Sequence, residues 1–193
     1  MKKFEIRIQE LHELLPIFMR ENLSDLNSIT EVICEAFTNG NKILICGNGG
    51  SAADAQHIAA EFVNRFASDL NRKALPAISL SADSSVITSI ANDFSFESVF
   101  SRQIMAMGNH GDILIILSTS GESKNCLNAA LTSRELGLKT IAFTNQSSSL
   151  TELADYSIKV PSTNTQHIQE CHLVAYHVLV ELVEDKLYRG SNG

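Results

Sequence analysis

The chain contains no tryptophan and only 3 prolines among its 193 residues, and aromatic residues make up just 6%. It also lacks any run near the ~20 apolar residues that a membrane-spanning helix needs, so no membrane association is expected. Basic residues are not in excess, since 15 Lys and Arg stand against 22 Asp and Glu for a formal net charge of −7. Nucleic-acid-binding proteins normally present a basic face, and no nucleic-acid partner is therefore expected.

Cysteine usage and the N-terminus indicate the compartment. The four isolated cysteines form no CxxC pair, which is typical of free buried thiols in a reducing environment. They are Cys34, Cys46, Cys126 and Cys171. Residues 1–7 mix charges of both signs and lack the apolar segment of a signal peptide. These features predict a cytoplasmic protein.

A single domain accounts for residues 1–193, with a helical N-terminal arm at about 1–38. Hydrophobic residues make up 44% of the chain, which is ordinary for a globular core and too many for a disordered protein. There is no internal repeat and no low-complexity segment that would indicate another architecture.

Two helices are predicted in the arm. Apolar residues recur every 3 or 4 positions over 4–18, which indicates an amphipathic helix, and Pro16 is expected to kink or divide it. Ser28 and Glu31 have the spacing of a capping box at the start of the second helix. The residues at 39–41, Asn-Gly-Asn, are expected to end that helix.

Short, continuously apolar runs and helical patterns alternate along the rest of the chain. The runs lie at 42–46, 77–80, 113–117, 140–143 and 156–160. The helical patterns lie at about 50–66, 84–107 in two pieces, 123–136 and 165–188. This alternation is typical of a parallel sheet covered on both faces. The expected fold is a three-layer α/β/α sandwich with a five-stranded parallel sheet and added N- and C-terminal helices.

The last helical pattern, at about 165–188, leaves little polar face. A helix that is apolar nearly all round is normally buried, and in a chain of this size that burial favours a second subunit. The apolar stripe of the N-terminal arm indicates the same. We therefore expect a homo-oligomer whose interface includes both terminal helices.

Three of the 10 glycines fall within 47–50, between an expected strand and the start of a helix. Glycines allow close backbone approach, and a helix N-terminus favours an anion. A Walker loop needs a Gly-Lys-Ser/Thr ending, and no lysine is present here. A dinucleotide fingerprint needs a third glycine, where this chain has Ala52, and an acidic residue at the end of the next strand, where it has none. A tight turn without a ligand remains the alternative.

A second loop carries Ser118, Thr119, Ser120 and Ser123 at the start of another helix. Hydroxyls at a helix N-terminus form a phosphate cradle from neutral donors. Ser123 is also a natural N-cap of the helix, which is a purely structural role. Since this loop contains no lysine before Lys124, it suits a small phosphate ester better than a nucleoside triphosphate with magnesium.

Polar residues within two apolar helices are the remaining candidates. His57 and Glu61 lie one turn apart on one helix face, and such a pair suits zinc binding or proton transfer, although a solvated pair is the common alternative. On the last helix, Gln169 and His177 are separated by about 80° and ~12 Å. They can share one metal only if that helix starts irregularly or if two subunits supply the ligands. For each of Gln169, His172 and His177, a satisfied core residue is the alternative.

Taken together, these segments resemble the phosphoheptose isomerases of the sugar-isomerase (SIS) fold. The resemblance covers nearly the whole chain. It is carried by 47–51, 54–57 with Glu61, 91–94, 118–121, and 168–170 with His177. It implies the five-stranded α/β/α domain and a homotetramer with active sites between subunits.

The resemblance also implies a set of site residues. One zinc ion per subunit is bound by His57, Glu61, Gln169 and His177. A small-molecule sugar phosphate is contacted by Asn48, Gly49, Gly50, Ser51, Glu61, Asn92, Asp93, Ser118, Thr119, Ser120, Ser123 and Gln169. Arg65, expected one turn beyond Glu61 on the same face, is a candidate anion contact. Some relatives carry an acid where this chain has Gln166, so the role of that position is open.

The implied reaction converts D-sedoheptulose 7-phosphate to D-glycero-D-manno-heptose 7-phosphate, a ketose–aldose isomerisation. It moves a proton between C1 and C2 through an enediol, with Glu61 as the candidate base, His177 as the acid and zinc as the Lewis acid. The product feeds synthesis of lipopolysaccharide, capsule or surface glycoprotein, and the sequence does not distinguish these.

Two other functions stay open at this stage. A related SIS tetramer binds the replication initiator protein without catalysis, but its pattern lacks the carboxylate at Glu61 and the histidine at His177. A sugar-phosphate sensor that binds without turnover is the other alternative.

Overall fold

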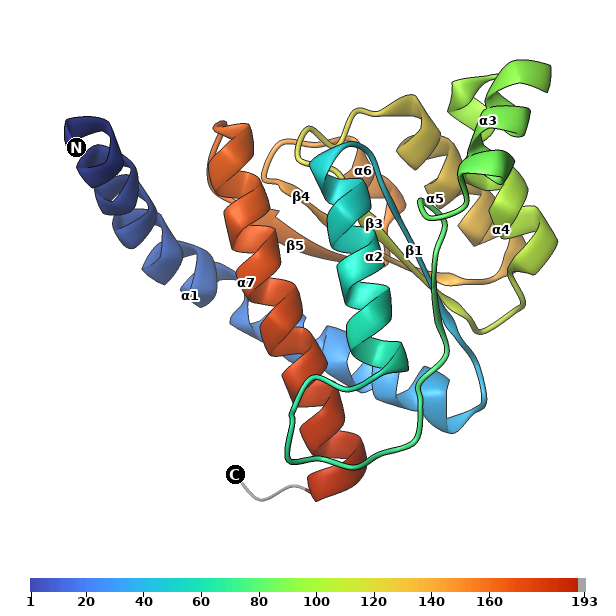
Figure 1. The fold of residues 1–193 in the computed structure, drawn as a ribbon, viewed down its shortest axis with the longest axis horizontal. Coiled ribbons are helices and arrows are strands. Elements are labelled where there is room, and N and C mark those ends of the chain that lie inside the picture. The colour runs from blue at the N-terminus through green and yellow to red at the C-terminus, as the bar shows by residue number, and fades with distance from the viewer. Residues whose placement is uncertain (191–193) are drawn as a thin grey trace.

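The computed structural model describes residues 1–190, and residues 191–193 of the expected domain lie outside the described part. One sheet contains five strands, all parallel, in the order β2-β1-β3-β4-β5. The strands are β1 Ile43–Gly47, β2 Ala77–Ser79, β3 Ile113–Leu117, β4 Lys139–Asn145 and β5 Tyr156–Val160. Helices cover both faces, so the expected three-layer fold is confirmed (Figure 1).

The helices follow the expected order. They are α1 Lys2–Thr38, α2 Gly50–Val63, α3 Ser84–Asp93, α4 Ser101–Met107, α5 Lys124–Leu136, α6 Leu150–Leu153 and α7 Thr165–Glu184. A short 3-10 helix at Phe96–Ser98 separates α3 from α4, and a π-helical turn at Asp185–Arg189 follows α7. In residues 1–190, no helix combines the length and the apolar character that crossing a membrane requires.

Alternating strand side chains divide the core into two layers. Ile43 and Ile45 of β1 point toward α1, α2 and α7, whereas Leu44 and Cys46 point toward α4, α5 and α6. Figure 1 shows α2 and α7 next to each other on the near side of the sheet. Because both faces are covered, every residue of β1 and β3 is buried, and this explains why these strands show no polar alternation.

The N-terminal arm is one continuous helix, so Pro16 does not divide it, and the prediction of two separate helices is wrong. A proline costs the helix one hydrogen bond, and long-range packing here outweighs that cost. Phe18 is buried, and the Asn22 amide accepts from the Lys159 N–H at 2.7 Å and donates to the Lys159 carbonyl at 2.9 Å. Asn22 thereby continues the ladder at the edge strand β5 and anchors α1 on the sheet.

The expected capping box is also wrong, because Ser28 and Glu31 lie in the interior of α1. The Ser28 hydroxyl donates to the Ser24 carbonyl at 3.1 Å, one turn earlier in the same helix. The end of the helix at 39–41 is as predicted, with Asn39 as the C-cap.

The last helix, α7, is buried on one side only within this chain. Tyr176, Leu179 and Val183 are at most 1% exposed, but Val174 and Val178 are 42% and 38% exposed. The burial expected on all sides is therefore not met by the chain alone, and an apolar strip of α7 remains at the surface.

His172 lies on the core side of α7, against the Phe143 ring. It is 0% exposed; its Nε2 lies 3.5 Å from the Thr144 carbonyl, and its Nδ1 has no hydrogen-bond partner in the described part of the chain. Burial lowers the pKa of His172 to about 4, although the contact with the Thr144 carbonyl opposes this shift. The imidazole is therefore neutral in the folded protein near neutral pH.

We expect His172 to make the fold sensitive to mild acid. The unfolded chain takes up a proton near pH 6.5 and the folded chain near pH 4, so the free energy of unfolding falls as the pH drops between these values. The contribution is about 3 kcal/mol. Urea unfolding of the parent and of His172→Gln at pH 7.5 and pH 4.5 measures it. An equal pH dependence in both proteins contradicts the assignment.

Candidate active site

Two loops lie side by side at the carboxyl edge of the sheet. Gly47 at the end of β1 pairs with Leu117 at the end of β3, so the loops at 48–49 and 118–123 begin next to each other. Ligands of open α/β sheets bind at this edge. Both loops that the sequence marked as phosphate sites are therefore at the position where this fold holds its ligands.

The first loop approaches other segments closely. A Cβ on Gly47 would lie 2.9 Å from the backbone oxygen of Leu117, so this position requires glycine, and a Cβ on Gly50 would lie 2.5 Å from the side-chain Nε2 of Gln169. The start of α2 is thus in direct contact with α7. Gly50 is the first residue of α2, as the sequence predicted.

Asn48 and Asn125 join the two loops through their side chains. The Nδ2 of each amide donates to the Oδ1 of the other at 2.9 Å. Asn125 is buried in the first turn of α5, directly after the second loop. The side chain of Asn48 is therefore engaged by α5, and Ser51, also predicted as a ligand contact, is buried in α2.

Two hydroxyl groups of the second loop accept hydrogen bonds from backbone N–H groups of the same loop. Ser118 is buried and its Oγ accepts from the Gly121 N–H at 3.1 Å, whereas Ser120 is exposed and its Oγ accepts from the Glu122 N–H at 3.2 Å. Ser123 precedes α5 as predicted, but its hydroxyl makes no capping bond. That hydroxyl is thus available to a ligand at the helix N-terminus.

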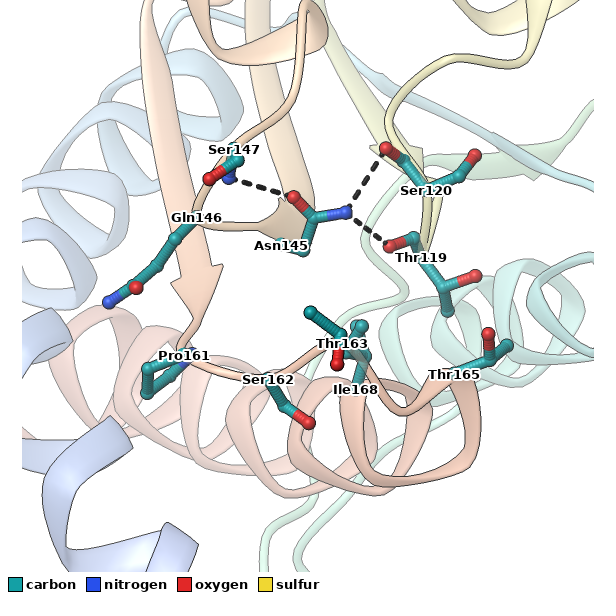
Figure 2. A pocket seen from close by; sticks show the side chains of 10 residues that line it. All are labelled: Thr119, Ser120, Asn145, Gln146, Ser147, Pro161, Ser162, Thr163, Thr165 and Ile168. Atoms are coloured by element: carbon teal, nitrogen blue, oxygen red, sulfur yellow. Dashed lines mark hydrogen bonds between the residues drawn. The ribbon is translucent and has the colours of Figure 1, made fainter.

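A cleft of about 750 Å³ opens beside the second loop, between the ends of β4 and β5 and the start of α7 (Figure 2). Its described lining carries hydroxyls and amides and no charged side chain. The lining residues are Thr119, Ser120, Asn145, Gln146, Ser147, Pro161, Ser162, Thr163, Thr165 and Ile168. Only Thr119 and Ser120 among them were predicted as site residues.

Helices α2 and α7 bring three of the predicted residues together. His57 Nε2 lies 3.0 Å from Glu61 Oε1, one turn along α2. The His57 ring lies 5.1 Å from the ring of His177 on α7, in an edge-to-face arrangement. A carboxylate and two imidazoles therefore form one cluster of groups that can act as acids and bases.

Gln169 is bonded to a residue in the first turns of α2. Its Nε2 donates to Asp54 Oδ2 at 2.8 Å. Tyr176 bridges the two groups, because its hydroxyl lies 3.4 Å from Asp54 Oδ1 and 3.1 Å from His57 Nδ1. Sequence reasoning assigned no role to Asp54 or Tyr176. Helical spacing could have found them, since Asp54 precedes His57 by three residues and Tyr176 follows Gln169 by seven.

Burial governs the proton affinities in this region. It raises the pKa of Asp54, although hydrogen bonds from Gln169 and Tyr176 oppose the shift. It also raises the pKa of Tyr176, as does the nearby Asp54. Burial and the adjacent His57 lower the pKa of His177, against the opposing effect of Glu61. The neutral imidazole of His177 is therefore favoured.

Asn92 and Asp93 do not join this cluster within the chain. They are exposed at the end of α3, where the Asn92 amide donates to Asp93 Oδ1 at 2.8 Å. Figure 1 shows α3 and α7 well apart in the molecule. A shared site would therefore need these residues from another copy of the chain.

Arg65 is not one further turn along α2, so that expectation is wrong. The helix ends at Val63 with Asn64 as its C-cap, and Arg65 is exposed in the loop beyond it. The C-terminal carbonyls of α2 are bound instead by Arg72, which donates to the Glu61 and Phe62 carbonyls at 2.8 Å. Gln166 is exposed in the first turn of α7.

The four predicted zinc ligands match the metal in kind. Imidazole, carboxylate and amide groups are suitable ligands, and His57, Glu61 and His177 lie in one cluster. Gln169 is bonded to Asp54. In the part of the chain that the structure describes, no group of three or more His, Cys, Asp and Glu side chains is arranged to hold a metal ion.

Comparison with known proteins places this arrangement in a family. Residues 8–145 match the model of the SIS domain. A phosphoheptose isomerase of Synechocystis sp. is 49% identical over 181 residues, covering 93% of this chain and 92% of the relative. One of Aquifex aeolicus is 42% identical over 192 residues, covering 99% and 100%.

A solved structure gives the same result. The phosphoheptose isomerase GmhA of Neisseria gonorrhoeae superimposes with a TM-score of 0.89 at 32% identity, covering 95% of this chain and 98% of the other. Fold and edge loops thus define an SIS-domain protein. Within that class, the chain belongs to the phosphoheptose isomerase family, and it is an isomerase.

Proposed function

We propose that this protein converts D-sedoheptulose 7-phosphate to D-glycero-D-manno-heptose 7-phosphate. The observation that carries the proposal is the contact of the His57–Glu61 pair with His177 across α2 and α7. His57 and Glu61 lie on α2, the helix that begins directly after the first loop. The curated relatives that share its sequence are named phosphoheptose isomerases.

The reaction shifts one hydrogen and relocates the carbonyl group. The Glu61 carboxylate removes a proton from C1, and an enediol forms when the C2 carbonyl oxygen takes up a proton from the N–H of His177. Glu61 then returns its proton to C2, and the O1 proton passes to the His177 nitrogen that gave up its own, so the aldehyde forms at C1 and both residues regain their starting protonation states. A positioned acid and base of this kind contribute about 10²–10⁴-fold each. Before it transfers its proton, the neutral His177 donates a hydrogen bond to the oxyanion that develops on the C2 oxygen.

We propose that His57, Glu61, Gln169 and His177 hold one zinc ion per subunit. Their nitrogen and oxygen donors support the choice of metal. Gln169 must first release Asp54, its partner in this structure at 2.8 Å. When bound, zinc supplies a Lewis acid that polarises the oxygens on C1 and C2. A carboxylate bound to metal is a weaker base, so Glu61 must exchange between its two roles.

We propose that neutral donors bind the substrate without a basic pocket. Ser118, Thr119, Ser120 and Ser123 contact the phosphate at the N-terminus of α5. The remaining contacts to the sugar phosphate come from Asn48, Gly49, Gly50, Ser51, Glu61, Asn92, Asp93 and Gln169. Binding energy from the phosphate, remote from C1 and C2, then serves to position the reacting carbons.

We propose a homotetramer in which the active sites lie between subunits. An apolar groove of about 430 Å³ between α1 and α7 supports this assembly. Its walls include Met19 and Leu23, which are 65% and 57% exposed, and Val174 of α7. The exposed positions of Asn92 and Asp93 also favour a site completed by a second copy.

Four free, buried cysteines support a cytoplasmic location.

The decisive experiment follows aldose formation from sedoheptulose 7-phosphate by the purified protein. We expect turnover, its loss after chelation and dialysis, and its recovery on adding zinc, with about one zinc per subunit by elemental analysis. Absence of turnover with zinc supplied rejects the proposed reaction. Calorimetric binding without conversion would then identify a sensor, and capture of the initiator protein would identify the non-catalytic alternative.

A further inference from the structure

Asn145, the last residue of β4, is bonded to the backbone of the hydroxyl loop. Its Nδ2 donates to the Thr119 carbonyl at 2.9 Å and to the Ser120 carbonyl at 3.1 Å. Its Oδ1 accepts from the Ser147 N–H at 2.8 Å, which fixes the orientation of the amide. Figure 2 shows this side chain between its own loop and the ends of Thr119 and Ser120.

The Asn145 side-chain amide determines which face of the loop backbone at Thr119 and Ser120 is left without a hydrogen-bond partner. Asn145 binds the oxygen of the peptide group between Thr119 and Ser120, so the N–H of that group, which belongs to Ser120, points away from the Asn145 amide. The peptide group of the Ser120 carbonyl carries the N–H of Gly121, which donates to the Ser118 carbonyl at 3.1 Å. Among residues 1–190, the N–H groups of Thr119 and Ser120 donate to no backbone or side-chain acceptor. Two unpaired N–H groups in consecutive loop residues form an anion-binding arrangement.

The rest of the loop is packed against the same neighbouring segment. A Cβ on Gly121 would lie 2.1 Å from the Ser148 Cβ, so Gly121 fits closely against Ser148. The Glu122 carboxylate accepts from the Ser149 N–H at 2.7 Å and from its Oγ at 2.9 Å. These contacts hold Gly121 and Glu122, whereas Asn145 alone binds the carbonyls of the two hydroxyl residues.

We propose that Asn145 is a positioning residue that holds the loop at 118–121 in its phosphate-binding shape. The inference rests on the proposed function, because it assigns the loop to the phosphate of the substrate. Asn145 itself touches the loop and not the reacting carbons. Its loss should therefore weaken phosphate binding and leave the proton transfer at C1 and C2 largely intact.

The test compares Asn145→Ala and Asn145→Asp with the parent enzyme. Two measurements are made on each: KM and kcat for sedoheptulose 7-phosphate, and Ki for inorganic phosphate as a competitor. We expect KM and Ki to rise together, by about 10-fold in Asn145→Ala. The rise should be larger in Asn145→Asp, since a carboxylate cannot donate to the two carbonyls and adds negative charge beside the loop. The kcat should change by less than about threefold.

Asn128→Ala is the matched control. The Asn128 amide also donates to a backbone carbonyl, that of Glu97 at 3.1 Å, but Asn128 does not line the cleft beside the loop. We expect parental KM and Ki in this variant. If Asn145→Asp fails to fold, as judged by circular dichroism, Asn145→Ala decides the question.

The outcomes separate the two proposals. A parent enzyme that turns over, with unchanged KM and Ki in Asn145→Ala, overturns the role of Asn145 alone. A fall in kcat with unchanged Ki overturns it as well. A parent protein without turnover overturns the proposed function, and the assignment of Asn145 to phosphate binding is then rejected with it.

Discussion

Glu61→Gln is expected to lower kcat by about 10³-fold, because the amide cannot accept the proton from C1. The substitution keeps the size of the side chain and a hydrogen-bonding group toward His57, whose Nε2 lies 3.0 Å away. The Glu61 backbone is held independently, since its carbonyl accepts from Arg72 at 2.8 Å. The expected loss is therefore chemical, and steady-state kinetics with sedoheptulose 7-phosphate measures it.

Glu135→Gln makes the same chemical change at an exposed position of α5 and is the matched control. We expect parental kcat in this variant and parental melting temperatures in both. His177→Asn should show a comparable fall in kcat, because the ring that donates a proton to the substrate oxygen is removed. Full activity in Glu61→Gln and His177→Asn would show that neither residue has the assigned role. Zinc content should be measured in each variant, because both residues are also proposed ligands.

Glu184→Gln is expected to destabilise the fold by about 3–5 kcal/mol, the cost of breaking a buried ion pair. Glu184 and Arg72 have side chains that are 1% and 0% exposed, and their Oε1 and Nε atoms are 2.6 Å apart. Glu184 also accepts from the N–H groups of Phe66 and Ala67 at 2.8 and 3.0 Å. Burial raises the pKa of Glu184, but these N–H groups and Arg72 outweigh it and hold the pKa below its usual range.

This pair connects the end of α7 to the end of α2 and to the loop that follows it. Glutamine in place of Glu184 removes the counter-charge of Arg72 and directs an NH₂ group at existing donors. The free energy of unfolding from urea titration measures the loss. Asp69→Asn is the control, because the Asp69–Arg189 pair lies nearby but its side chains are 76% and 41% exposed. We expect less than about 1 kcal/mol there, and equal losses in the two variants would disprove the special role of the buried pair.

The same pair affects the proposed active site. Phe66, whose N–H binds Glu184, packs its ring 5.5 Å from the ring of His177. We therefore expect that Glu184→Gln, when folded, loses part of its activity, because Glu184 holds the residue that packs against His177. A sequence reading could not identify this pair, because Arg72 and Glu184 are 112 residues apart and neither lies in a recognisable motif.

Local sequence patterns were sufficient to predict most of the helices and strands. Short apolar runs predicted all five strands, since a parallel sheet covered on both faces buries its central strands β1 and β3 completely. Patterns failed where long-range contacts overrode local preference. Pro16 did not divide α1, because Asn22 anchors that helix on β5. The predicted helix at about 50–66 ended early, at Val63, where Arg72 binds the last carbonyls of α2.

The candidate site shows the same division. The spacing of His57 and Glu61 predicted their pairing, because residues four apart on a helix are neighbours. Their approach to His177 depends on the packing of α2 against α7, 116 residues further along the chain than Glu61. The roles of Asn125 and Asn145 gave no sequence signal, since an isolated asparagine is common in loops and helix starts.

The sequence by itself determined the class of fold, the two loops at the sheet edge and the polar residues that belong to each helix. These are local properties, encoded in hydrophobic period, glycine position and helical spacing. The tertiary structure alone decided that Gln169 binds Asp54, that Tyr176 bridges Asp54 and His57, and that Asn145 orients the hydroxyl loop. The physical reason is that side-chain hydrogen bonds form between whichever groups packing brings within about 3 Å, and this packing follows from the whole core.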